Sequence, residues 1–309
     1  MRIRILLRLA VACLCLGLCL GLGAVLPAAR AFALESTASA DTMDTARLAE
    51  AVQNEEAALH ARIGMAVSDT NGGDVWQYRG DERFPLNSTH KVFACAALLA
   101  RVDAGVLAPD RRVSITESML VVYSPITKKH LAPETMTLSE VCRASVSYSD
   151  NTAGNVVVDA AGGPAAVTAF MRSIGDGVTR LDRAEPELNE AAPGDPRDTT
   201  TPAAAAASLA RVVLGDALAP SSRAALTDWM LHDQVADGLL RAALPPDWRI
   251  ADKTGSGGHG SRSILAVVWP PKRSPLVVAI YITQTEASVQ DANLAIARIG
   301  RVLREAVGR

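Results

Sequence analysis

The chain has 309 residues, of which 49% are hydrophobic and 21% are charged. This is an ordinary globular composition, and the length is enough for one large or two smaller domains with a sizeable core. The 31 basic residues nearly balance the 33 acidic ones, and the net charge of −2 argues against a nucleic-acid-binding protein. Because the cysteines and histidines do not have zinc-binding spacing, we expect neither a metal nor a cofactor.

Residues 1–33 have the features of a secretory signal peptide. The first eight residues include three arginines, and residues 9–26 form an apolar stretch that small residues follow. A retained transmembrane anchor and a lipoprotein cut before Cys19 are the alternatives. We expect cleavage after Ala31 or Ala33, and a periplasmic protein with no membrane association after cleavage.

Cleavage would leave only two cysteines, Cys95 and Cys142. In an oxidising compartment such a pair is expected to form a disulfide bond. Two buried free thiols are the alternative.

Both ends of the chain show strand and helix patterns, whereas the middle is helical. After a helix at 44–60, strands are predicted at 63–67 and 75–78. The helical pattern then runs from about 88 to 232. Three further strands and a terminal helix follow, at 248–253, 262–269, 276–283 and 296–306.

This order predicts an α+β fold, in which an antiparallel sheet is flanked by the terminal helices. The sheet domain would be discontinuous, with residues 44–84 and 233–309. Residues 85–232 would form an inserted all-helical domain. Because ligand sites favour domain clefts, we expect the active site between the two.

The first motif with chemical content is Ser88-Thr89-His90-Lys91. If Ser88 begins a helix, Lys91 lies three residues on and shares its face. A serine hydroxyl becomes a nucleophile when a neighbouring base takes its proton, and a desolvated lysine amine can be that base. The N-terminus of the helix would also direct backbone N–H groups at developing negative charge. Alone, this motif is a weak signal.

Ser149-Asp150-Asn151 and Lys253-Thr254-Gly255 are the second and third motifs. Each has a purely structural alternative, a helix cap for the former and a glycine-rich strand end for the latter. In this order, however, the three motifs match the signature of class A β-lactamases and penicillin-binding proteins. The sequence resembles a class A serine β-lactamase over nearly all of its length beyond residue 44.

The fourth motif, at residues 180–190, is similar to the omega loop of class A β-lactamases. The resemblance implies that Glu185 activates the deacylating water, that Asn189 helps to hold this water, and that Arg183 and Asp198 clamp the ends of the loop. A solvated surface loop is the alternative, but residues 197–202 continue the family pattern. The positions of the two cysteines also match the disulfide of many class A enzymes.

The resemblance further implies a serine acyl-enzyme mechanism. Ser88 would attack the lactam carbonyl, and either Lys91 or Glu185, acting through a water, would take its proton. The backbone N–H groups of Ser88 and Ser256 would form the oxyanion hole. Ser149 would pass a proton to the departing lactam nitrogen.

The remaining family positions imply contacts with the substrate. Lys253, Thr254 and Arg262 would bind its carboxylate, and Asn151 would hold its side-chain amide. Tyr123 matches a position that lines the cleft. His90 lies inside the first motif but receives no role.

Residues 123–125, 198–202 and 260–264 look closest to the carbenicillin-hydrolysing branch. That branch often has arginine where this chain has Lys253. Carbapenem-hydrolysing members typically have an extra cysteine pair at the positions of Asn87 and Gly257, so carbapenemase activity is not expected.

The sequence therefore predicts a monomeric enzyme that hydrolyses penicillins and some cephalosporins and so gives antibiotic resistance. A peptidoglycan transpeptidase or carboxypeptidase is the first alternative, and it would usually lack the loop with Glu185. A non-enzymatic β-lactam sensor is the second.

Overall fold

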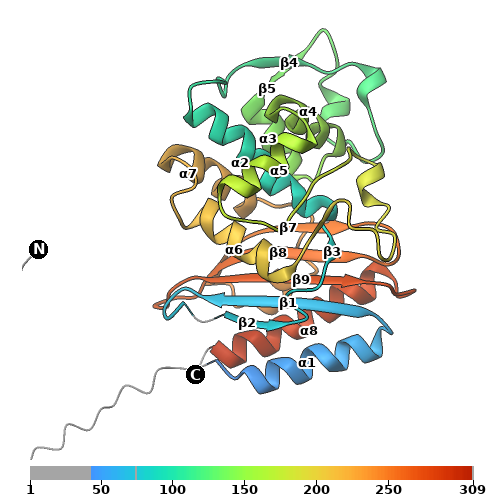
Figure 1. Cartoon of the computed structure of the whole chain (residues 1–309), viewed down its shortest axis with the longest axis vertical. Helices are drawn as coiled ribbons and strands as arrows, with labels where there is room; N and C mark the ends of the chain where they lie inside the picture. Colours follow the sequence, from blue (N-terminus) through green and yellow to red (C-terminus); the bar gives the residue numbers. More distant parts are fainter. Residues whose placement is uncertain (1–42, 74, 308–309) are drawn as a thin grey trace, which may run out of the picture. The chain divides into compact units, whose positions relative to one another are not determined.

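A five-stranded antiparallel sheet, built from both ends of the chain, lies at the centre of the computed structural model, which describes residues 43–73 and 75–307. The strand order is β2-β1-β9-β8-β7 (Figure 1). The strands are β1 (Arg62–Asp69), β2 (Val75–Tyr78), β7 (Arg249–Ser256), β8 (Arg262–Trp269) and β9 (Leu276–Thr283). Strands β8 and β9 are buried on both faces, which explains their nearly continuous apolar sequence. The predicted signal peptide lies outside the described residues.

Two terminal helices cover one face of the sheet. Helix α1 (Thr45–Ala58) and helix α8 (Val289–Val307) lie side by side below the sheet in Figure 1. Asp44 caps α1 by accepting a hydrogen bond from the Arg47 N–H. The apolar stripe of α8 packs on the sheet in one hydrophobic cluster. This confirms the predicted α+β arrangement of sheet and terminal helices.

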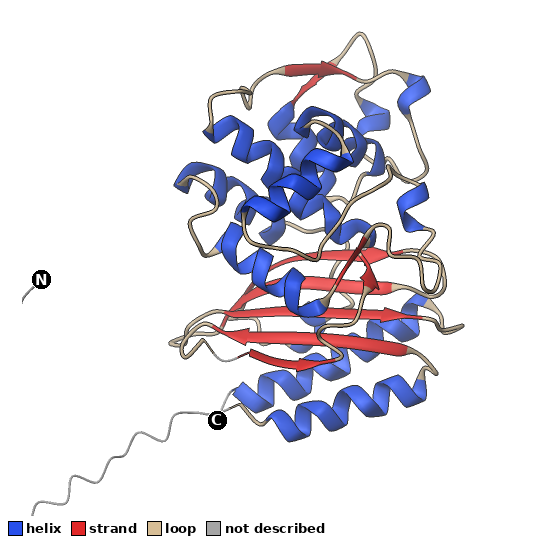
Figure 2. Cartoon of the chain, viewed as in Figure 1, coloured by secondary structure: helices blue, strands red, loops and turns tan. Residues whose placement is uncertain are grey.

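The other face of the sheet carries a layer of helices (Figure 2). They are α2 (His90–Asp103), α3 (Leu138–Ser147), α4 (Asn151–Ala161), α5 (Pro164–Ser173), α6 (Pro202–Val213) and α7 (Pro220–Leu231). Proline at the first helical position of α5, α6 and α7 is favourable, because its missing N–H would have no partner there. The hydrophobic cluster of this layer includes residues of β1, β7, β8 and β9, so the sheet belongs to both cores.

The middle of the chain is less uniformly helical than predicted. Short strands pair β3 (Phe84–Pro85) with β6 (Thr199–Thr200), and β4 (Arg112–Ser114) with β5 (Thr135–Thr137). Residues 174–198 contain no α-helix and form a long connection. The described residues form one compact unit, and the domain boundaries near residues 84 and 232 stay a prediction.

Helix α2 is the most deeply buried helix segment of this layer. All of its residues from His90 to Leu99 are buried, as expected for a helix that is packed on every side. It packs against α4, α7, α3 and α5, and the short 3₁₀ turn Asn87–Thr89 precedes it directly. The turn that carries Ser88 is therefore held by the best-packed part of the molecule.

The predicted disulfide between Cys95 and Cys142 is not formed in this structure, where both are free, buried cysteines. The Cys95 sulfur instead lies 3.8 Å from the carbonyl oxygen of Cys142, which is the arrangement of a thiol donor. Burial raises the pKa of the Cys95 thiol well above its usual value, so this thiol is protonated and unreactive at neutral pH. The pair therefore contributes here as small core residues.

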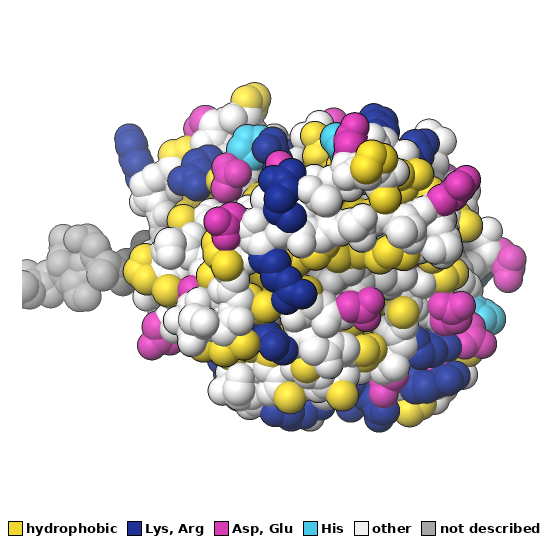
Figure 3. Space-filling view, turned by 90° about the horizontal axis from the view of Figure 1, so that it is seen from above, with side chains coloured by type: hydrophobic (Ala, Val, Ile, Leu, Met, Phe, Trp, Pro, Cys, Tyr) yellow, Lys and Arg dark blue, Asp and Glu magenta, His cyan; other side chains and the backbone are white. Residues whose placement is uncertain are grey.

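The surface of the helical layer carries no dominant charge. Seen from above, basic, acidic and apolar side chains alternate over this face (Figure 3). Within residues 43–73 and 75–307, no helix has both the length and the apolar character needed to cross a membrane.

Candidate active site

Ser88 and Lys91 are brought together at the start of α2. The Lys91 amine donates a hydrogen bond to the Ser88 hydroxyl, with 2.9 Å between Nζ and Oγ. It also donates to the Ser149 carbonyl oxygen at 2.9 Å and to Asn151 Oδ1 at 2.5 Å. The two side chains meet as expected, although Ser88 lies in the 3₁₀ turn Asn87–Thr89 and α2 itself begins at His90. The same amine also links Ser88 to the second motif.

Lys91 also meets the omega loop inside the protein. Its Nζ lies 3.1 Å from Glu185 Oε1, and both side chains are fully buried. Burial lowers the pKa of the Lys91 amine, while the neighbouring Glu185 carboxylate opposes this shift. An amine with a lowered pKa, in direct contact with a hydroxyl, has the properties of a general base.

Glu185 is held by two asparagines. Its backbone N–H donates to Asn155 Oδ1 at 2.8 Å, and the Asn155 amide donates to the Glu185 carbonyl at 2.9 Å. The Asn189 amide donates to Glu185 Oε2. This contact fits the water-holding pair that the family resemblance implies. Asn155 was not predicted. Its position four residues after Asn151 on α4 is a helical spacing that puts the two residues on the same face of the helix.

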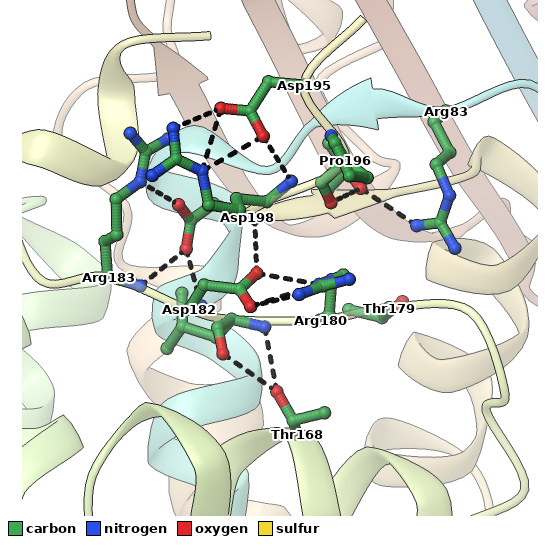
Figure 4. A network of polar contacts seen from close by, with 12 residues as sticks. Arg83, Thr168, Thr179, Arg180, Asp182, Arg183, Asp195, Pro196 and Asp198 are labelled. Carbon is green, nitrogen blue, oxygen red and sulfur yellow. Dashed lines mark hydrogen bonds and ion pairs between the residues drawn. The ribbon is translucent and has the colours of Figure 1, made fainter.

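The omega loop is clamped at its base by an ion-pair network (Figure 4). Arg183 Nε donates to Asp198 Oδ2 at 2.6 Å, and the Asp198 side chain is fully buried. The same carboxylate accepts the backbone N–H groups of Asp182 and Arg183 at 2.7 and 2.9 Å. Arg180 in turn pairs with Asp182, and this contact lowers the pKa of Asp182. The alternative of a freely solvated loop is therefore wrong at this end.

The second motif serves both as a helix cap and as a wall of the site. Asp150 caps α4 by accepting from the Ala153 N–H at 2.8 Å, as the structural alternative proposed. Its neighbours on either side, Ser149 and Asn151, line the cleft instead. Ser149 has φ of +58°, an uncommon conformation for a residue other than glycine. Asn151 is fixed by donating to the Val122 carbonyl at 2.8 Å.

The third motif forms the end of strand β7 and faces the nucleophile. A Cβ on Gly255 would lie 2.5 Å from Ser263 Oγ and 3.1 Å from the Ser88 nitrogen, so glycine lets the strand end pack this closely against both. Lys253 is fully buried, and burial lowers the pKa of its amine to about 8. Asp233, also buried, opposes this shift. Thr254 and Ser256 lie on the same strand and line the cleft.

Arg262 lies opposite Ser256 on the neighbouring strand β8. Its Nε donates to Asn293 Oδ1 on α8 at 2.7 Å, and its NH1 donates to the Gly255 carbonyl at 3.0 Å. Burial lowers the pKa of this guanidinium to about 10, so it stays charged at neutral pH. Asn293 has no counterpart in the sequence motifs, and no spacing rule would have identified it.

These residues surround a cleft of about 390 Å³. Its lining includes nine predicted or motif residues, namely Ser88, Tyr123, Ser149, Asn151, Asn189, Thr254, Gly255, Ser256 and Arg262. Tyr123 is 52% exposed at the rim. Val235 and Val289 also line the cleft, but nothing in the sequence distinguished them from other valines. Lys91, Glu185 and Lys253 lie behind the lining and are buried.

Among the described residues, no group of three or more His, Cys, Asp or Glu side chains is placed to hold a metal ion. The cleft instead has a hydroxyl nucleophile, a buried amine and carboxylate behind it, and cationic groups on one side. This arrangement suits acyl transfer to serine from a substrate that carries a carboxylate.

Comparisons with known proteins agree with this chemistry. The model of the beta-lactamase enzyme family matches residues 47–307. β-Lactamase AER-1 of Aeromonas hydrophila is 65% identical over 265 residues, which cover 86% of this chain and 87% of that protein. β-Lactamase PSE-4 of Pseudomonas aeruginosa is 48% identical over 245 residues, which cover 79% of this chain and 85% of that protein.

Solved structures show the same relationship. An ancestral class A β-lactamase superposes with a TM-score of 0.82 at 54% identity, covering 84% of this chain and 99% of that chain. A putative class A β-lactamase from Rhodopseudomonas palustris gives 0.82 at 47% identity, with coverages of 84% and 99%. The chain therefore belongs to the beta-lactamase enzyme family. Within it, the chain is a class A serine enzyme that hydrolyses the β-lactam amide bond of penicillins and so gives antibiotic resistance, as predicted.

Proposed function

We propose that Ser88 is the nucleophile and that Lys91 is the group that takes its proton. The 2.9 Å contact between Lys91 Nζ and Ser88 Oγ is the observation that carries this assignment. Glu185 lies 3.1 Å from Lys91 Nζ and takes a proton from the ammonium, which leaves the neutral amine that accepts the Ser88 proton. Attack on the lactam carbonyl then gives an acyl-enzyme, and the lactam C–N bond breaks.

The Ser88 and Ser256 backbone N–H groups stabilise the oxyanion of this step, and Ser149 delivers a proton to the departing nitrogen. Thr254 and Arg262 in the cleft lining bind the substrate carboxylate together with Lys253, whose buried amine lies behind the lining. Asn151 and Tyr123 contact the substrate side chain. The close approach of β7 to the Ser88 nitrogen supports the oxyanion assignment.

Deacylation is the step that separates a hydrolase from a penicillin-binding protein. Glu185 and Asn189 hold and activate the water that attacks the ester, after which Ser88 is released. The buried Glu185 carboxylate, its contact with Asn189 and the clamped loop behind it support hydrolysis over a stable acyl-enzyme. We further propose that the mature enzyme is a periplasmic monomer, based on the predicted signal peptide.

The substitution Glu185→Gln tests the deacylation assignment. Loss of a general base lowers the rate of the step by about 10²–10⁴-fold, so a penicillin adduct on Ser88 should accumulate. Intact mass spectrometry measures the adduct directly. Glu187→Gln, an exposed glutamate in the same loop, is the matched control and should turn over normally. Normal turnover by Glu185→Gln would remove Glu185 from the mechanism.

A further inference from the structure

His90 lies between the nucleophile and Lys91 in the sequence, yet neither the motif nor the mechanism gives it a role. Its side chain is 1% exposed, and its Nδ1 lies 2.7 Å from the backbone carbonyl oxygen of Asn87. A carbonyl oxygen can only accept, so Nδ1 must carry the hydrogen. Nε2 is buried without a hydrogen-bond partner in the described part of the chain, which agrees with this tautomer.

The Asn87 carbonyl belongs to the same peptide group as the Ser88 N–H. In a trans peptide these two groups point in opposite directions. The carbonyl meets His90, while the Ser88 nitrogen faces β7 at Gly255. Within the described residues, no protein acceptor bonds to the Ser88 N–H. This N–H is therefore free for the oxyanion, and His90 bonds to the opposite end of its peptide.

We propose that His90 is a positioning residue for the oxyanion hole, which it affects by orienting and polarising the Asn87–Ser88 peptide group. Hydrogen bonds in series strengthen one another, so donation to the carbonyl makes the attached N–H a better donor. The inference rests on the proposed oxyanion role of the Ser88 N–H.

The backbone at this point needs support. Asn87 has φ of +44°, a left-handed conformation that is uncommon outside glycine but that asparagine adopts more readily than most residues. The Asn87 side chain donates to Ser261 Oγ at 3.0 Å, which ties the turn to the β7–β8 hairpin. The His90 imidazole in turn holds the Asn87 carbonyl, through its Nδ1. The His90 backbone N–H also donates to this carbonyl, so three hydrogen bonds hold the residue that sets the direction of the Ser88 N–H.

His90 is neutral in this position. Burial lowers the pKa of its imidazole to about 4, although Glu185 and Asp198 act in the opposite direction and Lys91 adds to the effect. A neutral imidazole keeps its donor without adding a positive charge next to Lys91. The donor is therefore constant across the neutral pH range.

Two nearly isosteric substitutions separate hydrogen bonding from packing. His90→Asn keeps an N–H donor close to the Nδ1 position, whereas His90→Leu has a similar branched shape and no donor. We expect kcat/KM for a penicillin to fall about tenfold in the leucine variant, and the asparagine variant to recover most of the loss. If the leucine variant does not fold, His90→Phe supplies a donor-free aromatic ring for the same comparison.

The infrared carbonyl frequency of the acyl-enzyme is a readout that packing alone does not move. With the acyl-enzyme trapped in the Glu185→Gln background, the ester carbonyl should absorb at higher frequency in the donor-free variant than in the asparagine variant. Equal frequencies, together with equal losses of kcat/KM in both variants, would overturn the role of His90 and leave the acyl-enzyme mechanism intact. Absence of any adduct on Ser88 by mass spectrometry would instead contradict the proposed function, and the inference with it.

Discussion

At the scale of single residues, the site depends on charges that are buried in defined surroundings. Lys91 has four polar partners within 3.1 Å and no exposure to solvent. Lys253 is equally buried, but among the described residues its amine donates a hydrogen bond only to the adjacent Thr254 carbonyl oxygen, at 3.0 Å. The two lysines therefore differ in how many protein groups contact their amines.

Penicillin binding should weaken as the pH rises through about 8. Burial lowers the pKa of the Lys253 amine to about 8, so this amine is charged below that pH and neutral above it. Since the substrate carboxylate needs the charged form, KM should rise about tenfold from pH 7 to pH 9. Steady-state kinetics between pH 7 and pH 9 measures this change in KM.

Lys253→Arg is the control for this prediction, because arginine keeps its charge at these pH values. The resemblance to the carbenicillin-hydrolysing branch also suggests that the site accepts arginine here. KM should then be flat between pH 7 and 9. A KM that rises equally in both enzymes would show that a different group titrates.

Arg262→Ser should raise KM for penicillins about tenfold, since a hydrogen bond to a charged partner is worth about 1.5–3 kcal/mol. Asn293 and the Gly255 carbonyl hold the guanidinium at the cleft, and serine brings no cation to that position. Arg249→Ser is the matched control, because Arg249 stacks on Trp269 at the first residue of β7, at the opposite end of that strand from the cleft residues 254–256. Equal KM values in the two variants would mean that another cation binds the carboxylate.

At the scale of elements, the omega loop is the part whose position matters most. It supplies Glu185 from a segment without α-helix, so its geometry comes from its anchors rather than from local propensity. Asp198 is the main anchor, with Arg183 Nε at 2.6 Å and two backbone N–H groups on the same carboxylate. The fixed base of the loop is what keeps Glu185 against Lys91.

Asp198→Asn should therefore impair both folding stability and deacylation. Breaking a buried ion pair from one side costs about 3–5 kcal/mol, which a thermal or urea unfolding experiment detects. The acyl-enzyme should also persist longer, because Glu185 is less firmly placed. Asp195→Asn is the control, since its pair with Arg197 lies at the surface, where solvent screens it and its loss should leave stability nearly unchanged. Identical stabilities of the two variants would contradict the anchoring role.

Sequence reasoning was reliable where the signal is local. The strands at 75–78, 262–269 and 276–283 have the predicted bounds, because alternating or continuous apolar residues end at clear turns. The prediction of a helical middle was too coarse, because strand pairs such as β3 with β6 form between segments more than a hundred residues apart in the sequence. No periodicity within either segment carries that information.

The same limit applies to the site. The motifs identified Ser88, Lys91 and Glu185, but the contact between the last two joins residues 94 positions apart in sequence. Asn155 and Asn293 act through hydrogen bonds that only the packed structure creates. The predicted disulfide shows the converse case, since compartment and family pattern favoured a bond that this structure does not contain.

At the scale of the whole molecule, the site depends on a sheet that contributes to two hydrophobic cores, one on each face. One face packs on α1 and α8, and the other packs on the helical layer that carries Ser88. Strand β7 is at the sheet edge next to that layer, so the third motif meets the first across the cleft. Site residues that are as far apart in the sequence as Ser88 and Asn293 thus belong to one site.

The central claim is that this serine forms a transient acyl-enzyme, and time-resolved intact mass spectrometry with a penicillin tests it most directly. A single adduct, of the mass of one intact penicillin, should appear on the enzyme and then disappear while hydrolysed penicillin accumulates. Ser88→Ala should form no adduct. An adduct that persists for hours on the unaltered enzyme, or turnover by Ser88→Ala, would contradict the account.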